Sequence, residues 1–314
     1  LVRGGDHLGP TLAPRISDAL RFVGRALRPA EPAVDPMLEA LRELVAANEM
    51  TMGYRTTRVI DGPAGAIEVS TVGQGPTVVL LASLGRAADD FADLANRLAE
   101  AGYQAIAPQP RGIGRTEGLH AGLTMGELAA DVAAVIRAST DAPAYVVGHA
   151  FGNRVARMTA TEHPGLVAGV ACLAAGGLVP PSARAAAALV AVFDRTRAPD
   201  AHADAVAEAF FAPGNDPTPF LDGWHVELAA AQRHATESTP VEHWWSAGTA
   251  PVLVVQGADD VIALRENAER LAATGGQRVE ILDVPRAGHA LLPEQPGAVA
   301  TALLGWLSRR PLPQ

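Results

Sequence analysis

The chain has 314 residues, of which 48% are hydrophobic and 19% are charged, so it is long and apolar enough for one large domain or two and is not a disordered chain. Its 25 basic residues are all Arg, and it has 34 acidic residues, which gives a net charge of −9. This negative charge disfavours non-specific nucleic-acid binding. The lack of lysine excludes lysine-held pyridoxal phosphate, and the single cysteine, Cys172, excludes an intrachain disulfide.

Residues 1–50 are expected to form an N-terminal helical extension. Apolar residues recur at helical spacing over residues 16–27, and a second short helix is expected over residues 36–47. This extension is interpreted either as an arm packed on the body or as a dimerisation arm of a homodimer; its several Glu residues argue against a membrane surface. The first 35 residues contain no apolar secretory core and no run in the chain is long enough to span a membrane, so a cytoplasmic location is expected.

From residue 51 the pattern alternates between buried strands and amphipathic helices. Strands are expected at residues 57–60, 66–72, 77–82, 104–107, 144–147, 167–174, 252–255 and 279–284. Helices are expected at residues 89–101, 124–138, 153–163, 265–273 and 297–307. This alternation predicts a mostly parallel central sheet with helices on both faces, built from residues 51–177 and 249–314. Residues 178–248 show helical patterns without strands, which predicts a helical cap inserted over one edge of the sheet.

The most informative motif lies where the strand at 144–147 runs directly into a helix. There the sequence reads Gly148-His149-Ala150-Phe151-Gly152. It resembles the nucleophile elbow of the α/β-hydrolase superfamily, Gly-x-Ser-x-Gly, whose glycines allow a sharp turn that presents the middle residue above the sheet. The residue at the nucleophile position is Ala150, which has no hydroxyl group.

Two further residues match the superfamily in chain order. Asp260 follows the strand at 252–255 and matches the acid, with Asp259 as the alternative. His289 follows the strand at 279–284 and matches the catalytic base. The resemblance therefore implies an α/β-hydrolase fold and a catalytic set of Ala150, Asp260 and His289 in the order elbow, acid, base.

The resemblance also implies an oxyanion hole made of two backbone N–H groups. One belongs to Phe151, the residue after the elbow, and the candidate for the other is Leu84, in the loop after the strand at 77–82. Ser83 in that loop and Trp224 in the cap are candidate substrate-binding residues. The aromatic residues of the cap are expected to form its core and to wall an apolar pocket.

Arg86 and His149 have two interpretations each. Arg86 lies just past the oxyanion loop and is a candidate ligand for a substrate carboxylate, or else it pairs with Asp89 or Asp90 at the start of the next helix. His149 lies beside the elbow, where such a side chain packs beneath the nucleophile or contributes to the substrate site. The other histidines show no spacing typical of metal ligands, so neither a metal nor a cofactor is expected.

Ala150 leaves two explanations open for the activity. In one, the chain is an ester or lactone hydrolase with Ser-Asp-His chemistry in which alanine has replaced the nucleophile and inactivated it. In the other, alanine is natural, and the His289–Asp260 pair serves general-base, lyase or cofactor-free oxygenase chemistry, or the protein only binds a ligand. In each case the expected partner is a small molecule, an apolar ester or lactone for the hydrolase.

Overall fold

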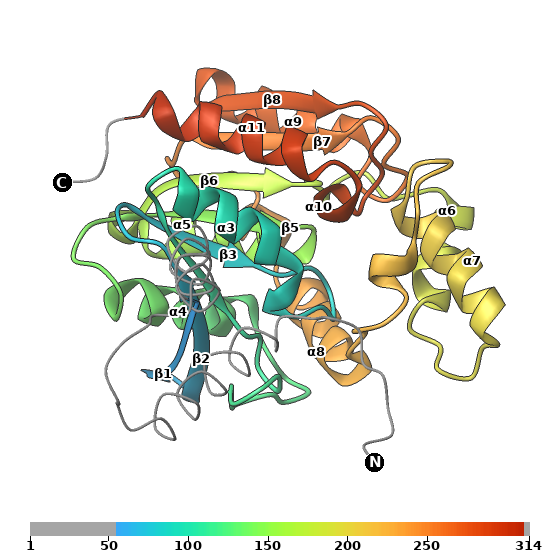
Figure 1. Cartoon of the computed structure of the whole chain (residues 1–314), viewed down its shortest axis with the longest axis horizontal. Helices are drawn as coiled ribbons and strands as arrows, with labels where there is room; N and C mark the ends of the chain where they lie inside the picture. Colours follow the sequence, from blue (N-terminus) through green and yellow to red (C-terminus); the bar gives the residue numbers. More distant parts are fainter. Residues whose placement is uncertain (1–54, 311–314) are drawn as a thin grey trace, which may run out of the picture. The chain divides into compact units, whose positions relative to one another are not determined.

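The computed structural model describes residues 55–310, which contain an eight-stranded sheet in the order β1-β2-β4-β3-β5-β6-β7-β8 (Figure 1). β1 and β2 form an antiparallel hairpin, β2 pairs antiparallel with β4, and the other neighbours are parallel. The α/β-hydrolase fold with its mostly parallel sheet, expected from the sequence, is confirmed. The helices predicted within residues 1–50 lie outside the described residues. The strands are β1 Thr56–Gly62, β2 Gly65–Val72, β3 Thr77–Leu81, β4 Gln104–Pro108, β5 Ala144–His149, β6 Val167–Leu173, β7 Val252–Gly257 and β8 Val279–Val284.

Helices connect the parallel strands and agree closely with the ranges expected from periodicity. α4 begins with a capping box, in which Thr124 and Glu127 each accept a hydrogen bond from the other's backbone N–H. No helix within residues 55–310 combines the length and apolar character that crossing a membrane requires. The helices outside the 178–248 segment are α3 Ala92–Glu100, α4 Met125–Arg137, α5 Phe151–Glu162, α9 Arg265–Gly275, α10 Leu291–Glu294 and α11 Pro296–Ser308.

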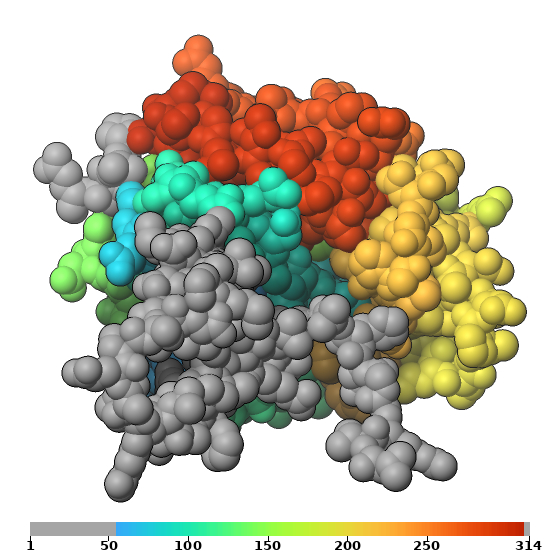
Figure 2. Space-filling view, viewed as in Figure 1, coloured from blue at the N-terminus to red at the C-terminus, as the bar shows by residue number. Residues whose placement is uncertain are grey.

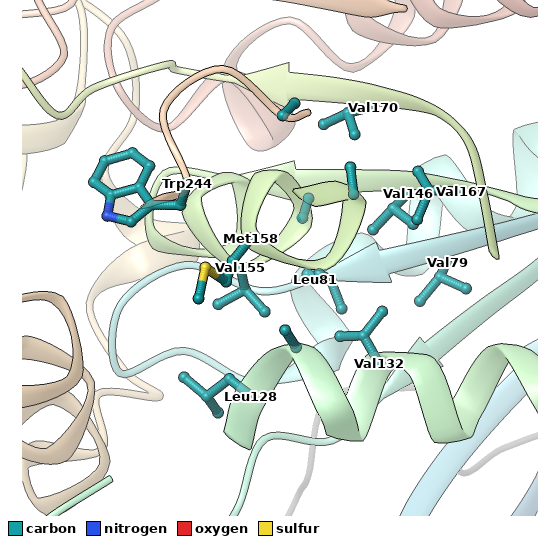
Figure 3. Close-up of a cluster of buried hydrophobic side chains, with 14 of the residues drawn as sticks. Val79, Leu81, Leu128, Val132, Val146, Val155, Met158, Val167, Val170 and Trp244 are labelled. Atoms are coloured by element: carbon teal, nitrogen blue, oxygen red, sulfur yellow. The ribbon is translucent and has the colours of Figure 1, made fainter. Parts of the chain in front are cut away.

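Alternate side chains of the central strands point into two separate hydrophobic cores. On β3, Val78 and Leu80 join the core under α3 and α11, whereas Val79 and Leu81 join the core under α4, α5 and α9. Figure 3 shows the second core, in which Val132 of α4 packs near the sheet valines. Because both faces of these strands are covered, their residues form apolar runs instead of alternating with polar ones.

Residues 178–248 form the connection between β6 and β7 and contain helices but no strand. They include α6 Ala183–Ala191, α7 Pro199–Phe210 and α8 Val226–Glu237. α6 and α7 lie beyond the carboxyl ends of β6 and β8 (Figure 1). We call this segment the helical insertion.

The helical insertion is joined to the loop after β8 by a group of hydrogen bonds. The side-chain carboxylate of Glu294 accepts from the backbone N–H groups of Ala212 (2.7 Å) and Gly288 (2.8 Å) and from the side chain of Asn215 (2.8 Å). The Ala290 N–H donates to the Phe210 carbonyl oxygen at 2.8 Å. Figure 2 shows the yellow insertion and the red C-terminal segment in contact. We call the hydrogen bonds that Glu294 accepts from Ala212, Asn215 and Gly288 the Glu294 seam.

Candidate active site

The chain turns sharply from β5 into α5 at Ala150, the one residue between them. Ala150 has φ 48° and ψ −107°, a backbone conformation that side-chain-bearing residues rarely adopt. A Cβ on Gly148 would collide with the backbone of Gly152, and one on Gly152 would collide with the Leu81 carbonyl oxygen of β3. Both positions therefore require glycine, and together they let the turn place residue 150 at the carboxyl end of the sheet.

Asp260 and His289, which come from the loops after β7 and β8, meet beside this turn. His289 Nδ1 lies 3.0 Å from Oδ2 and 3.1 Å from Oδ1 of Asp260, and the two side chains are 6% and 0% exposed. Asp260 Oδ1 also accepts from the backbone N–H groups of Ile262 and Ala263, each at 2.8 Å. These bonds hold the carboxylate in place, whereas the neighbouring Asp259 is exposed.

The contact with Asp260 determines which nitrogen of His289 is free to react. A carboxylate only accepts hydrogen bonds, so the Nδ1 that faces it carries the ring proton and Nε2 carries the lone pair. His289 Nε2 has no hydrogen-bond partner among residues 55–310, and the His289 side chain lines a cavity. A neutral imidazole held in this way has the geometry of a general base.

The cavity has a volume of about 510 Å³ and contains both Ala150 and His289 in its wall, a size typical of small-molecule sites. Most of its wall is apolar, with contributions from both the sheet side and the helical insertion. Within residues 55–310, no three His, Cys, Asp or Glu side chains lie close enough together to hold a metal ion. The apolar wall includes Leu178, Val179, Pro180, Leu189, Phe210 and Ile262.

Leu84, Phe151 and Ser83 also line the cavity. The backbone N–H groups of Leu84 and Phe151 have no acceptor in the part of the chain that the structure describes. Phe151 is the first residue of α5, so its N–H is one of those that a helix leaves unpaired. Two N–H groups without an acceptor therefore belong to residues that line the same cavity as Ala150.

A family model described as serine aminopeptidase, S33, matches residues 75–296. The chain belongs to this family. Among curated relatives, it is 28% identical over 256 residues to RutD of Variovorax paradoxus, a proposed carbamate hydrolase, covering 77% of this chain and 95% of RutD. It is 31% identical over 232 residues to BpoC of Mycobacterium tuberculosis, a proposed non-heme bromoperoxidase, covering 65% of this chain and 82% of BpoC.

Solved structures share the fold of this chain. Rv0554 of Mycobacterium tuberculosis superposes with a TM-score of 0.68 at 26% identity, covering 82% of this chain and 100% of that one. The enol-lactonase of Burkholderia xenovorans superposes with a TM-score of 0.68 at 20% identity, covering 80% of this chain and 100% of that one. The second likeness concerns the fold alone.

In this S33 family chain, His149 lies beneath the elbow and outside the cavity wall. It is fully buried, and its Nε2–H donates to the His289 carbonyl oxygen at 2.7 Å. Burial, together with the neighbouring His289, lowers the pKa of His149 to about 4, so its ring is neutral at pH 7. The assignment of His149 to substrate binding is therefore replaced by a positioning contact with the backbone of His289.

Arg86 and Trp224, which the sequence suggested as substrate-binding residues, are not among the residues that line this cavity. Arg86 forms a two-pronged ion pair with Asp90 at 2.7 and 2.8 Å and donates to the Asp222 carbonyl oxygen. Its guanidinium lies 4.2 Å from the ring centroid of Phe220 and 4.7 Å from that of Trp224. All of its nitrogens have acceptors and Arg86 is 4% exposed, so the pairing with Asp90 replaces the carboxylate-ligand interpretation.

Three charged cavity residues were missed by sequence reasoning, Arg154, Arg233 and Glu237. Arg154 is four residues after Ala150, a spacing that puts both on one side of α5, and this was the signal available in the sequence. Arg233 lies on α8, and no sequence pattern connects it to the elbow. The two arginines bring positive charge, and Glu237 brings a negative charge, to a cavity whose wall is otherwise largely apolar.

Proposed function

We propose that this chain hydrolyses a small or medium, largely apolar carboxylic ester or lactone, with the His289–Asp260 pair activating water directly. The observation that carries the proposal is that His289, which is held by Asp260, lines one cavity together with Leu84 and Phe151, whose N–H groups are free, and that residue 150 offers only a methyl group there. Residues 178–248 act as the cap that shields the site from bulk water.

In the proposed reaction, water occupies the space that a serine hydroxyl would fill beside Ala150. His289 Nε2 takes a proton from this water as its oxygen bonds to the carbonyl carbon. The negative charge that develops on the carbonyl oxygen is bound by the N–H groups of Leu84 and Phe151. When the intermediate collapses, the bond from carbon to the leaving oxygen breaks, and His289 returns the proton to that oxygen.

The magnitudes of these contributions support slow but measurable hydrolysis. A positioned general base contributes about 100- to 10,000-fold, and each oxyanion donor contributes roughly 3 kcal/mol of barrier lowering. In serine hydrolases that lose the nucleophile, an acceleration of about 1,000- to 10,000-fold over water remains. Restoring a hydroxyl at residue 150 should therefore increase the rate substantially, since the other parts are in place.

The test is hydrolysis of p-nitrophenyl butyrate and of dihydrocoumarin by the unaltered chain and by three variants. We expect slow turnover that falls at least about 100-fold in His289→Ala, is unchanged in the control His243→Ala, which removes an exposed histidine, and rises in Ala150→Ser with a burst of acyl-enzyme. Turnover that His289→Ala leaves intact would overturn the general-base role. Inactivity of both the unaltered chain and Ala150→Ser would overturn the hydrolase proposal.

A further inference from the structure

Arg154 lies in the cavity wall without a charge partner. It follows Ala150 by four residues on α5, about 6 Å along the helix axis, and lines the same cavity as Ala150 and His289. Its guanidinium lies 5.6 Å from the ring centroid of Trp244, and it has no hydrogen-bond acceptor or carboxylate partner among residues 55–310. Burial without a partner lowers the pKa of Arg154 below its ordinary value.

Arg233 of α8 lines the same cavity in a similar state. Its guanidinium lies 4.6 Å from the ring centroid of Phe193, and its Nη2 is buried with no hydrogen-bond acceptor. Glu237, four residues later on α8, lines the same cavity and attracts Arg233 electrostatically, but it is exposed and forms no ion pair with Arg233 within 4 Å. The cavity thus receives guanidinium groups from two elements that are far apart in the sequence.

These two arginines differ from the buried arginines near the site that pair with carboxylates. Arg157 of α5 also has no carboxylate partner, but it donates to Asn153 Oδ1 and to the Gly176 carbonyl oxygen. Arg86 and Arg111 are almost fully buried, whereas Arg154 and Arg233 are half-buried. Arg86 and Arg111 each form a short ion pair with a carboxylate, Asp90 at 2.7 Å and Asp131 at 2.7 Å. An unpaired buried charge is costly to a fold unless a ligand or another charge compensates it. In a chain with a net charge of −9, acidic partners are plentiful, yet none within residues 55–310 pairs with Arg154 or Arg233.

We propose that Arg154 and Arg233 bind a carboxylate group of the substrate, which makes the substrate a half-ester of a short dicarboxylic acid or a lactone that carries a free carboxylate. This inference deepens the proposed function, because the bound carboxylate orients the scissile carbonyl beside His289. The spacing of Arg154 from Ala150 places the carboxylate a few bonds from that carbonyl. A planar guanidinium binds carboxylate through two parallel hydrogen bonds, which fixes direction as well as position.

The apolar wall and the two arginines together define the selectivity. The apolar groups accept the hydrocarbon part of the substrate, and the arginines reject analogues whose carboxylate is esterified. A neutral diester would leave both guanidinium groups unpaired, so discrimination against it should be large. Arg86 contributes nothing to this selectivity, since its donors are engaged by Asp90 and Asp222.

The test measures binding separately from turnover. Titration calorimetry of the full chain with glutarate, a dicarboxylate that has no ester bond, should show binding, and dimethyl glutarate should bind at least 10-fold more weakly. Arg154→Gln and Arg233→Gln should each weaken glutarate binding at least 10-fold while leaving dimethyl glutarate binding unchanged. The control Arg184→Gln removes an arginine that is exposed and lies outside the cavity, and should have no effect.

The outcomes separate this inference from the proposed hydrolysis. If glutarate fails to bind, or if both cavity variants bind it as well as the unaltered chain, the carboxylate site is wrong even if esters are hydrolysed. If glutarate binds through both arginines but no ester is turned over, the site stands and the hydrolase proposal fails. Arg154→Lys keeps the charge and loses the paired hydrogen bonds, so it should bind glutarate with intermediate affinity; equality with Arg154→Gln in a folded variant would contradict the charge argument.

Discussion

Replacing Ala150 with glycine should stabilise the protein, although this substitution destabilises almost every other alanine. Ala150 has φ 48° and ψ −107°, and such a conformation costs a side-chain-bearing residue about 1–3 kcal/mol. Glycine removes this strain but loses about 0.5–1 kcal/mol through its greater freedom in the unfolded chain. Since the Ala150 methyl group is only half-buried, little hydrophobic stabilisation is lost, and the net gain is about 1 kcal/mol.

The matched control is Ala156→Gly on the same helix. Ala156 is 0% exposed and lies in the interior of α5, so glycine there loses about 1 kcal/mol of helix propensity and about 0.8 kcal/mol of methyl burial. The two substitutions change the same atoms and should shift the free energy of unfolding in opposite directions, with a difference of about 3 kcal/mol.

Urea unfolding of both variants and the unaltered chain, followed by circular dichroism, measures this difference. The denaturation midpoint of Ala150→Gly should rise and that of Ala156→Gly should fall, with similar slopes. If Ala150→Gly is destabilised as much as Ala156→Gly, the turn stores no strain, and the steric reasoning about the elbow is wrong.

Three further predictions concern buried polar groups. The pKa of His149 is about 4 in the folded protein against 6.5 in the unfolded chain, so between these values the unfolded chain binds an extra proton, and the free energy of unfolding should fall by about 3 kcal/mol from pH 6.5 to 4. Urea unfolding at several pH values should show a shallower fall in His149→Gln, and an equal fall in both proteins would contradict this. Burial raises the pKa of Cys172 to about 11, so Ellman's reagent at pH 8 should react only after urea unfolds the chain, and fast native reaction would be the contrary result. Arg86→Met should lower the free energy of unfolding, measured in urea, by about 3 kcal/mol or more because Asp90 is left buried and unpaired. Adding Asp90→Asn to this variant should restore part of the lost stability, and no restoration would contradict a stabilising ion pair.

The positions of the elbow and the His–Asp pair could be predicted because they depend on local chemistry and chain order. Gly148 and Gly152 are required by the turn itself, and Asp260 and His289 follow strands whose apolar runs are visible in the sequence. In a parallel sheet the carboxyl ends of neighbouring strands lie at one edge, which brings such loop residues together. The fold therefore follows from the hydrophobic periodicity, and the proximity of Asp260 and His289 follows from the order of the strands along the chain.

The side-chain partners could not be predicted in the same way. In the sequence, Arg86 lies close to both the oxyanion loop and Asp90, so its partner could be a substrate carboxylate or Asp90. Phe220 and Asp222, which contact Arg86 in the folded protein and favour the pairing with Asp90, lie more than 130 residues further along the chain. For Arg154 the deciding property is the absence of an acceptor nearby, which only the folded arrangement determines. Local sequence patterns thus locate backbone positions well, but they say little about which partner a long side chain such as that of Arg binds in the folded protein.

The Glu294 seam has a consequence for how substrate can enter. One carboxylate accepts hydrogen bonds from Ala212 of the helical insertion and from Gly288, the residue before His289. Any motion that lifted the insertion along this seam would also disturb the loop that carries the base, so we expect the seam to remain closed during turnover. Substrate would then enter at another part of the cavity wall. Sequence change at Ala212 or Asn215 would disturb the Glu294 contacts and with them the loop that carries the base.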